Sequence, residues 1–287
     1  IIEINATRIN ARYLPEVIFP PNIHCSDDYQ TVLSGVQDIL IVVPSAVFHA
    51  NLVKLKPFLQ SNQRLLWASK GLDTKKHQLL NEVVKEILGD KEMAVLSGPS
   101  FAKEVAMGLP TAINIASENY NFAHDLLLRF QTKRFRVEIT SDIIGVELGG
   151  AMKNVLAIAV GITEGLGFGA NAKAAVITYG LSEMIELGLV LGAKQETFLG
   201  LSGLGDLVLT CTDNQSRNRR LGLALGRGQT LEETKKLIGT TEGYDTAKNI
   251  FYLLEKYAIK APFCEGVYRI LYEKKSPPTL FKTLFNE

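Results

Sequence analysis

The chain has 287 residues, of which 46% are apolar and 21% charged, and its formal net charge is +1 at pH 7. That length is enough for two domains with cores of their own, and the composition is typical of a globular protein. A charge so close to zero creates no field for nucleic acid or for a membrane surface. No apolar run approaches the roughly 18 residues of a transmembrane helix, so we expect neither a nucleic-acid partner nor an integral membrane segment.

The cysteines and histidines argue for a reducing location and against a metal site. Cys25, Cys211 and Cys264 are odd in number, scattered, and in no Cys-x-x-Cys pair, which favours the cytoplasm. The four histidines occur in no metal-ligand spacing. We therefore expect a cytoplasmic protein without a bound metal.

The first half of the chain has the pattern of an α/β protein. Prolines keep residues 1–30 from forming long regular elements. Short apolar runs follow at 38–43, 64–69 and 93–97, and helical patterns separate them. Continuous apolar strands that alternate with helices predict a mostly parallel sheet covered on both faces. Two further strands are predicted at 111–116 and 135–140, and whether they run antiparallel is left open.

The three apolar runs all end in small or special residues, at Pro44-Ser45, Lys70-Gly71 and Gly98-Pro99-Ser100. An open α/β sheet places its ligand crevice at the carboxyl ends of its strands, so we predict a binding edge there. Taken singly, each end is also compatible with an ordinary turn, and Lys70 with a solvated loop lysine.

Strand patterns stop at about Ser141 and helical patterns replace them, with helices predicted at 172–192, 231–239 and 245–257. We therefore expect a sheet domain over residues 1–140 and an all-helical domain over residues 141–287.

Lys153 is the first candidate for acid–base chemistry. It lies in the stretch 145–154, and on a helix its neighbours on the same face would be Gly149, Gly150, Leu156 and Ala157. Each glycine costs roughly 1 kcal/mol of helix propensity, which is tolerated where something must approach the backbone closely. A lysine in apolar surroundings has a lowered pKa and exchanges protons near neutral pH. The alternative is a lysine that extends to solvent from a helix edge.

A second candidate site lies at residues 200–220. Three glycines precede Asp206 and allow tight turns. Ser216 is a good helix N-cap, and Gly226 suits the end of the helix that follows. Free N–H groups at the helix start, with Arg217 and Asn218 in its first turn, favour an anion, and a planar arginine suits a phosphate. We predict a phosphate site here, and the alternative is a solvated basic turn.

The order and spacing of these motifs carry a family likeness. The matching stretches are Arg12-Tyr-Leu-Pro15, Val43-Pro-Ser45, Lys70-Gly71, Ser97-Gly-Pro-Ser-Phe-Ala102 with Glu104, 145–154, Gly203-Leu-Gly-Asp206, Ser216-Arg-Asn218 and Glu242-Gly243. Over nearly its whole length the sequence resembles the bacterial NAD(P)-dependent glycerol-3-phosphate dehydrogenases. The resemblance implies a Rossmann-like dinucleotide-binding domain at 1–140 and a helical substrate and catalytic domain at 141–287.

The resemblance also implies roles for single residues. Lys153 would be the proton donor and acceptor, and the cofactor would be NAD or NADP. The residues expected to bind the substrate are Lys70, Gly98, Ser100, Asp206, Ser216, Arg217 and Asn218. The residues expected to line the cofactor are Lys70, Ala102, Arg217, Thr240 and Glu242.

The implied reaction interconverts sn-glycerol 3-phosphate and dihydroxyacetone phosphate. Hydride passes between the nicotinamide and C2 while a lysine exchanges the proton of the C2 oxygen. Such an enzyme acts on a small molecule in the cytoplasm and supplies glycerol phosphate for phospholipid synthesis. A homodimer is left open.

The sequence departs from the family's pattern in three places. The Gly-x-Gly-x-x-Gly fingerprint expected on the first βα turn is absent, so we expect the chain to lack that N-terminal unit of roughly 30 residues. Tyr179 stands where the family usually has Arg, and Thr240 where it usually has Val.

The sequence is compatible with two alternatives. Another β-hydroxyacid dehydrogenase would share the two-domain plan, but such enzymes typically have an asparagine four residues after the lysine, and Ala157 stands there. A non-catalytic fragment would keep the phosphate site without a cofactor pocket.

Overall fold

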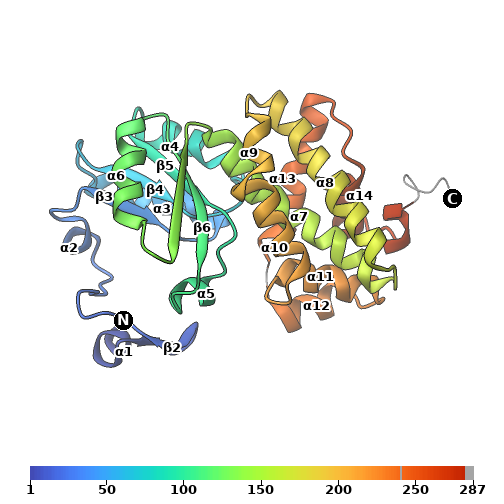
Figure 1. The fold of residues 1–287 in the computed structure, drawn as a ribbon, viewed down its shortest axis with the longest axis horizontal. Helices are drawn as coiled ribbons and strands as arrows, with labels where there is room; N and C mark the ends of the chain where they lie inside the picture. Colours follow the sequence, from blue (N-terminus) through green and yellow to red (C-terminus); the bar gives the residue numbers. More distant parts are fainter. Residues whose placement is uncertain (240, 282–287) are drawn as a thin grey trace.

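A five-stranded sheet forms the first part of the molecule in a computed structural model that describes residues 1–239 and 241–281 (Figure 1). The strands are, in order across the sheet, β3 (Asp38–Ile41), β4 (Arg64–Trp67), β5 (Met93–Ser97), β6 (Thr111–Ala116) and β7 (Phe135–Thr140). β3, β4 and β5 are mutually parallel, whereas β6 is antiparallel to β5 and β7 is parallel to β6. The last two strands therefore run opposite to the first three.

Helices cover both faces of this sheet, which confirms the predicted mostly parallel, Rossmann-like arrangement. α3 (Ser45–Leu55), α4 (Leu80–Leu88) and the start of α7 (Ile143–Gly165) pack on one face, and α6 (Tyr120–Phe130) packs on the other. On β4, Leu65 and Trp67 belong to the first cluster and Leu66 to the second. Because neighbouring side chains face opposite sides and both sides are covered, every residue of the central strands β4 and β5 is buried.

The segment before the sheet forms short elements, as its prolines predict. They are α1 (Ile2–Thr7), a small antiparallel hairpin of β1 (Ile9–Asn10) and β2 (Leu14–Ile18), and α2 (Tyr29–Leu33). Two more short helices, η1 (Lys56–Phe58) and α5 (Ala102–Ala106), occur between the strands.

The second part of the molecule is helical and lies beside the sheet part (Figure 1). After α7 it contains α8 (Ala170–Val190), α9 (Gln195–Leu199), η2 (Leu201–Gly205), α10 (Asp206–Thr212), α11 (Arg217–Gly226), α12 (Leu231–Ile238), α13 (Glu242–Tyr257), α14 (Pro262–Tyr272) and η3 (Pro277–Phe281). The helices predicted at 172–192, 231–239 and 245–257 correspond to α8, α12 and α13, apart from small shifts at their ends.

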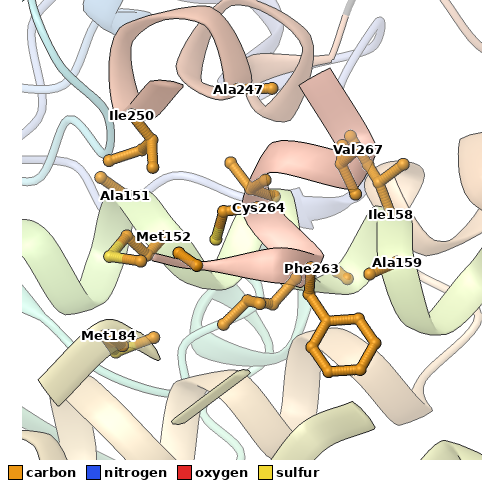
Figure 2. Close-up of a cluster of buried hydrophobic side chains, with 14 of the residues drawn as sticks. Ala151, Met152, Ile158, Ala159, Met184, Ala247, Ile250, Phe263, Cys264 and Val267 are labelled. Carbon is orange, nitrogen blue, oxygen red and sulfur yellow. The ribbon is translucent and has the colours of Figure 1, made fainter. Parts of the chain in front are cut away.

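α7 is the central helix of this part, and nearly all of its residues are buried. Met152 and Ile158 of α7 lie among Met184 of α8, Ile250 of α13 and Phe263 of α14 (Figure 2). By length and composition α7 would also suit a membrane, but 94% of its most apolar window is buried inside the protein. Its apolar character on all sides is therefore that of a core helix.

Glycines let α7 and α11 cross at very short range. A Cβ added at Gly161 would lie 2.1 Å from the carbonyl oxygen of Arg219, and one added at Gly222 would lie 2.0 Å from that of Ile158. Real Cβ atoms cannot approach backbone so closely, so any side chain here would push the helices apart. The crossing fixes α11, whose first turn carries the predicted phosphate site.

The Gly161→Ala variant should therefore lose stability by about 1–3 kcal/mol or more, because the added methyl group overlaps backbone atoms of α11. Gly205→Ala is a matched control, since its φ of −59° is helical and the nearest atom to an added Cβ is 3.6 Å away. Urea unfolding of both variants measures the difference. Equal midpoints for the two variants would show that the crossing tolerates a side chain.

Candidate active site

Two strand ends of the sheet face the helical part and supply the first side of the site. Lys70 follows β4, and its ammonium group donates a hydrogen bond of 3.0 Å to the carbonyl oxygen of Gly98, which follows β5. Gly98 has a φ of +146°, and a Cβ there would lie 2.9 Å from the Cα of Ile113. Only glycine suits that backbone, so the carbonyl that orients Lys70 has a fixed direction.

The glycines of α7 bring the helix close to this edge. A Cβ at Gly150 would lie 2.8 Å from the hydroxyl of Ser97 and 3.6 Å from the Cγ of Lys70, and one at Gly149 would lie 2.5 Å from the carbonyl oxygen of Ser202. Protein atoms therefore make the close approach that the two glycines predict. As a result, α7 carries Lys153 to the strand ends.

A buried carboxylate joins the two lysines. Asp206, at the start of α10, is 0% exposed, and its Oδ1 lies 2.5 Å from the Nζ of Lys153 while its Oδ2 lies 2.6 Å from the Nζ of Lys70. Lys153 is 6% exposed and also donates to the hydroxyl of Thr210 at 2.9 Å. Three chain segments far apart in sequence thus place two ammonium groups on one carboxylate.

Burial and the shared Asp206 carboxylate determine the pKa of Lys153 and of Asp206 itself. Burial, together with the positive charge of Lys70, lowers the pKa of Lys153 to about 8, although Asp206 opposes the shift. Burial alone would raise the pKa of Asp206, but the two ammonium groups outweigh it and lower that pKa below its usual value. Lys153 can therefore hold or release a proton close to neutral pH while Asp206 stays ionised.

The start of α11 lies near this group, and it is capped by the residue that the sequence predicts. Ser216 is the N-cap, and its hydroxyl accepts the N–H of Arg219 at 3.1 Å. Arg217 is exposed at the first position of the helix. Arg219 is buried and paired with Glu164, so it belongs to the core rather than to a ligand site.

Asn218 ties the first turn of α11 to two other helices. Its Nδ2 donates to the Oδ1 of Asn154 on α7 at 2.9 Å, and its Oδ1 accepts the N–H of Gly243 on α13 at 3.1 Å. Gly243 follows Glu242, a half-buried residue. Burial raises the pKa of Glu242 against the charges of Lys70, Lys153 and Arg217. The predicted phosphate and cofactor residues are therefore linked in space.

Other predicted residues lie around this group. The Ser100 hydroxyl donates to the carbonyl oxygen of Gly98 at 3.0 Å. Ala102 is exposed at the first position of α5, and Tyr179 is exposed on α8 beside Phe263. Thr240 lies outside the described residues.

The glycines before Asp206 behave differently from the prediction. None of Gly200, Gly203 and Gly205 has a positive φ, so they form no left-handed turn. They belong to η2 and its boundary, a single π-helical turn, and a Cβ at Gly203 would lie 2.1 Å from the carbonyl oxygen of Phe198. Close packing, rather than turn geometry, explains at least Gly203.

Two residues of the site were absent from the predicted set. Thr210 follows Asp206 by four residues, which places both side chains on one helix face and could have indicated it. Asn154 follows Lys153 directly, and nothing local indicates that it meets Asn218, 64 residues away.

Buried hydroxyls at the end of β5, in η2 and at the start of α13 bear on whether a dinucleotide suits the site. The hydroxyls of Ser97, Ser202, Thr241 and Thr246 are buried and have no hydrogen-bond partner within the described part of the chain. Thr246 and Ser45 both face Gly71, whose φ of +137° is another conformation that only glycine tolerates well. Polar groups of a nicotinamide dinucleotide would satisfy such hydroxyls, so the residues present fit that cofactor. Across residues 1–239 and 241–281, no cluster of three His, Cys, Asp or Glu residues could hold a metal.

A Rossmann-like sheet whose carboxyl edge faces a helical domain is the architecture of two-domain dinucleotide-dependent dehydrogenases. Models of the NAD-dependent glycerol-3-phosphate dehydrogenase N-terminus and C-terminus match residues 1–123 and 142–282. The chain therefore belongs to the NAD-dependent glycerol-3-phosphate dehydrogenase family.

Individual relatives agree with this assignment. Over 277 residues the chain is 50% identical to the glycerol-3-phosphate dehydrogenase [NAD(P)+] of Bartonella henselae, covering 96% of this chain and 82% of the relative. The crystal structure of the glycerol-3-phosphate dehydrogenase from Coxiella burnetii is 49% identical, with a TM-score of 0.95, and the match covers 100% of this chain and 88% of that one. For the enzyme of Saccharomyces cerevisiae the identity is 29%, the TM-score 0.87, and the coverage 99% and 85%.

The comparisons correct one expectation. The model of the family's N-terminal part matches from residue 1 to residue 123, so the expectation that the chain lacks the N-terminal unit is not borne out. The Gly-x-Gly-x-x-Gly pattern is one local signal, whereas the family model weighs all the residues it matches.

Asp206→Asn should destabilise the protein by about 3–5 kcal/mol at pH 7, because it leaves two buried ammonium groups without a counter-charge. The folded pKa of Lys153 lies below its unfolded value, so that lysine loses its charge as pH rises through about 8. The stability difference between Asp206→Asn and the wild type should therefore shrink above pH 8. Urea unfolding at pH 7 and pH 9.5 measures it, and a difference that stays constant would contradict the shared ion pair.

Proposed function

We propose that this protein interconverts sn-glycerol 3-phosphate and dihydroxyacetone phosphate with NAD or NADP, in support of phospholipid synthesis. The observation that carries the proposal is the pair of lysines on one buried carboxylate, beside the capped start of α11. In this proposal residues 1–140 hold the dinucleotide, and residues 141–287 supply the substrate site and the catalytic lysine.

The first turn of α11 is proposed to hold the phosphate. Ser216, Arg217 and Asn218 lie there, where the helix dipole and free N–H groups favour an anion. The planar guanidinium of Arg217 suits two phosphate oxygens at once. This contact would place the three-carbon chain toward Lys153 and Lys70, with Gly98 and Ser100 on the side of the strand ends.

Lys153 is proposed to exchange the proton of the C2 oxygen. When bound, the reduced nicotinamide supplies a hydride to C2 of dihydroxyacetone phosphate. As negative charge develops on the oxygen, the ammonium group of Lys153 donates its proton, and the ammonium group of Lys70 stabilises the remaining charge. In the reverse direction Lys153 takes the proton back.

Asp206 is proposed to keep both lysines in place during this exchange. Its two oxygens hold the two ammonium groups, and Thr210 gives Lys153 a second partner. A lysine with a pKa of about 8 suits a reaction that runs in both directions near neutral pH.

The cofactor is proposed to lie between the strand ends and α13. The residues proposed to line it are Lys70, Ala102, Arg217 and Glu242, together with Thr240, which lies outside the described residues. The buried hydroxyls of Ser97 and Thr246, which have no hydrogen-bond partner among the described residues, support this position.

Lys153→Met should lower kcat at least about a hundredfold, because it removes the proton donor while Asp206 keeps Lys70 as a partner. Lys153→Arg should not restore activity, since a guanidinium does not release its proton near neutral pH. Steady-state oxidation of NADH or NADPH with dihydroxyacetone phosphate is the measurement, and binding of the cofactor should stay close to normal. A folded Met variant within tenfold of the wild-type kcat would refute the role of Lys153.

Arg217→Ala should mainly raise KM for dihydroxyacetone phosphate and change the affinity for NADH less, because it removes a phosphate ligand and not the proton donor. Arg220→Ala is the matched control, since Arg220 is exposed on the same helix three residues further on. Initial rates at varied substrate concentration separate the two constants. If KM is the same in both variants, Arg217 does not bind the phosphate.

A further inference from the structure

Glu147 is a buried carboxyl group of α7 that the proposed chemistry does not use. It is 5% exposed, and it reaches from the helical part into the sheet part. Its Oε1 accepts the indole N–H of Trp67 at 3.0 Å and the backbone N–H of Asn81 at 3.2 Å, and its Oε2 lies 3.3 Å from the same N–H. One side chain thus joins β4, α4 and α7.

Through its contact with Asn81, Glu147 of α7 caps the N-terminus of another helix, α4. Asn81 lies in the first turn of α4, and the N-cap position is held by Leu79, whose side chain has no acceptor. The first N–H groups of a helix lack partners within the helix, and a side-chain oxygen that accepts one of them caps the helix. Glu147 supplies that acceptor, so it fixes α7 against the end of α4.

The contact with Trp67 sets the position of α7 along β4. Lys70 follows Trp67 by three residues, and Gly150 follows Glu147 by three residues. A Cβ added at Gly150 would lie 3.6 Å from the Cγ of Lys70. The contacts Trp67–Glu147 and Lys70–Gly150 therefore follow one another along the end of β4 and along α7. Lys153 comes three residues after Gly150 on the same helix.

We propose that Glu147 is a positioning residue that sets the separation between Lys70 and Lys153 around Asp206. The inference rests on the proposed function, in which both lysines act on one oxygen. A misplacement of about 1 Å can cost about a hundredfold in rate even when it originates far from the reacting atoms. Loss of the Glu147 contacts should therefore lower kcat, whereas the phosphate site on α11 should keep its affinity.

The chain contains a matched control in Glu183. This residue of α8 is 6% exposed and accepts the backbone N–H groups of Phe263 at 2.7 Å and Cys264 at 3.0 Å. Those two residues lie in the first turn of α14, so Glu183 also accepts N–H groups at the start of a neighbouring helix. It joins two helices of the helical part, and among the described residues its side chain has no hydrogen bond to the sheet part.

The test compares Glu147→Met with Glu183→Met in the full chain. Methionine keeps the length and the helix propensity but leaves the backbone N–H groups of the capped helix without an acceptor. Both variants should lower the thermal midpoint by a similar amount, on the order of 5 °C. Only Glu147→Met should also lower kcat, by about tenfold or more relative to Glu183→Met, while KM for dihydroxyacetone phosphate stays within about threefold.

Trp67 provides a second variant and a direct signal of the contact. It is the one tryptophan of the chain, so intrinsic emission reports on its surroundings alone. Glu147→Met should shift that emission and Glu183→Met should not. Trp67→Phe removes the indole donor and leaves the α4 cap, so it should lower kcat even if Glu147→Met fails to fold.

Three results would each contradict the positioning role of Glu147. They are equal kcat values for Glu147→Met and Glu183→Met, unchanged tryptophan emission in Glu147→Met, and a kcat of Trp67→Phe within twofold of the wild type. An inactive wild-type protein would overturn the proposed function and this inference together. An active wild type with an equally active Glu147→Met variant would overturn only the inference.

Discussion

The buried carboxylate of Asp206 holds the ammonium groups of the buried Lys153 and the partly buried Lys70. Two positive charges and one negative charge leave one net positive charge in the crevice. Burying that charge is costly, which is why the pKa of Lys153 falls to about 8. A substrate oxygen that gains negative charge would relieve this cost, so the group is suited to an oxyanion more than to a neutral ground state.

The rest of the fold can be understood as a means of bringing three distant segments to that carboxylate. The sheet fixes Lys70 at the end of β4, and η2 leads directly into α10 with Asp206 in its first turn. α7 reaches both because Gly149 and Gly150 leave room for Ser202 and Lys70. A side chain at either glycine would force α7 away from the strand ends and would separate Lys153 from its partner.

The sequence predicts well whatever depends on neighbours along the chain. The strands are recognisable because both faces of the sheet are covered, and Ser216 is recognisable as an N-cap because the residues after it form a helix. The apolar face around Lys153 likewise follows from helical periodicity. The glycines of α7 predict a close approach, but they do not say whether a ligand or the protein itself makes it.

Contacts between distant segments could not be predicted in this way. The bonds from Trp67 to Glu147 and from Asn218 to Asn154 span 80 and 64 residues, and neither side chain has a local pattern that names its partner. Thr210 is an intermediate case, since its spacing from Asp206 indicates a shared helix face but not the bond to Lys153. The expectation that the N-terminal unit is missing rested on one short motif, and the family model, which matches from residue 1, does not bear it out.

The central claim is that Lys153 shares the Asp206 carboxylate and titrates far below an ordinary lysine. Nuclear magnetic resonance of the full chain with ¹³C-labelled lysine tests this directly, because each side-chain methylene signal shifts when its ammonium group loses a proton. We predict one lysine signal that titrates near pH 8 and disappears in the Lys153→Met variant. If every lysine signal titrates close to the ordinary value of about 10.4, the account is contradicted.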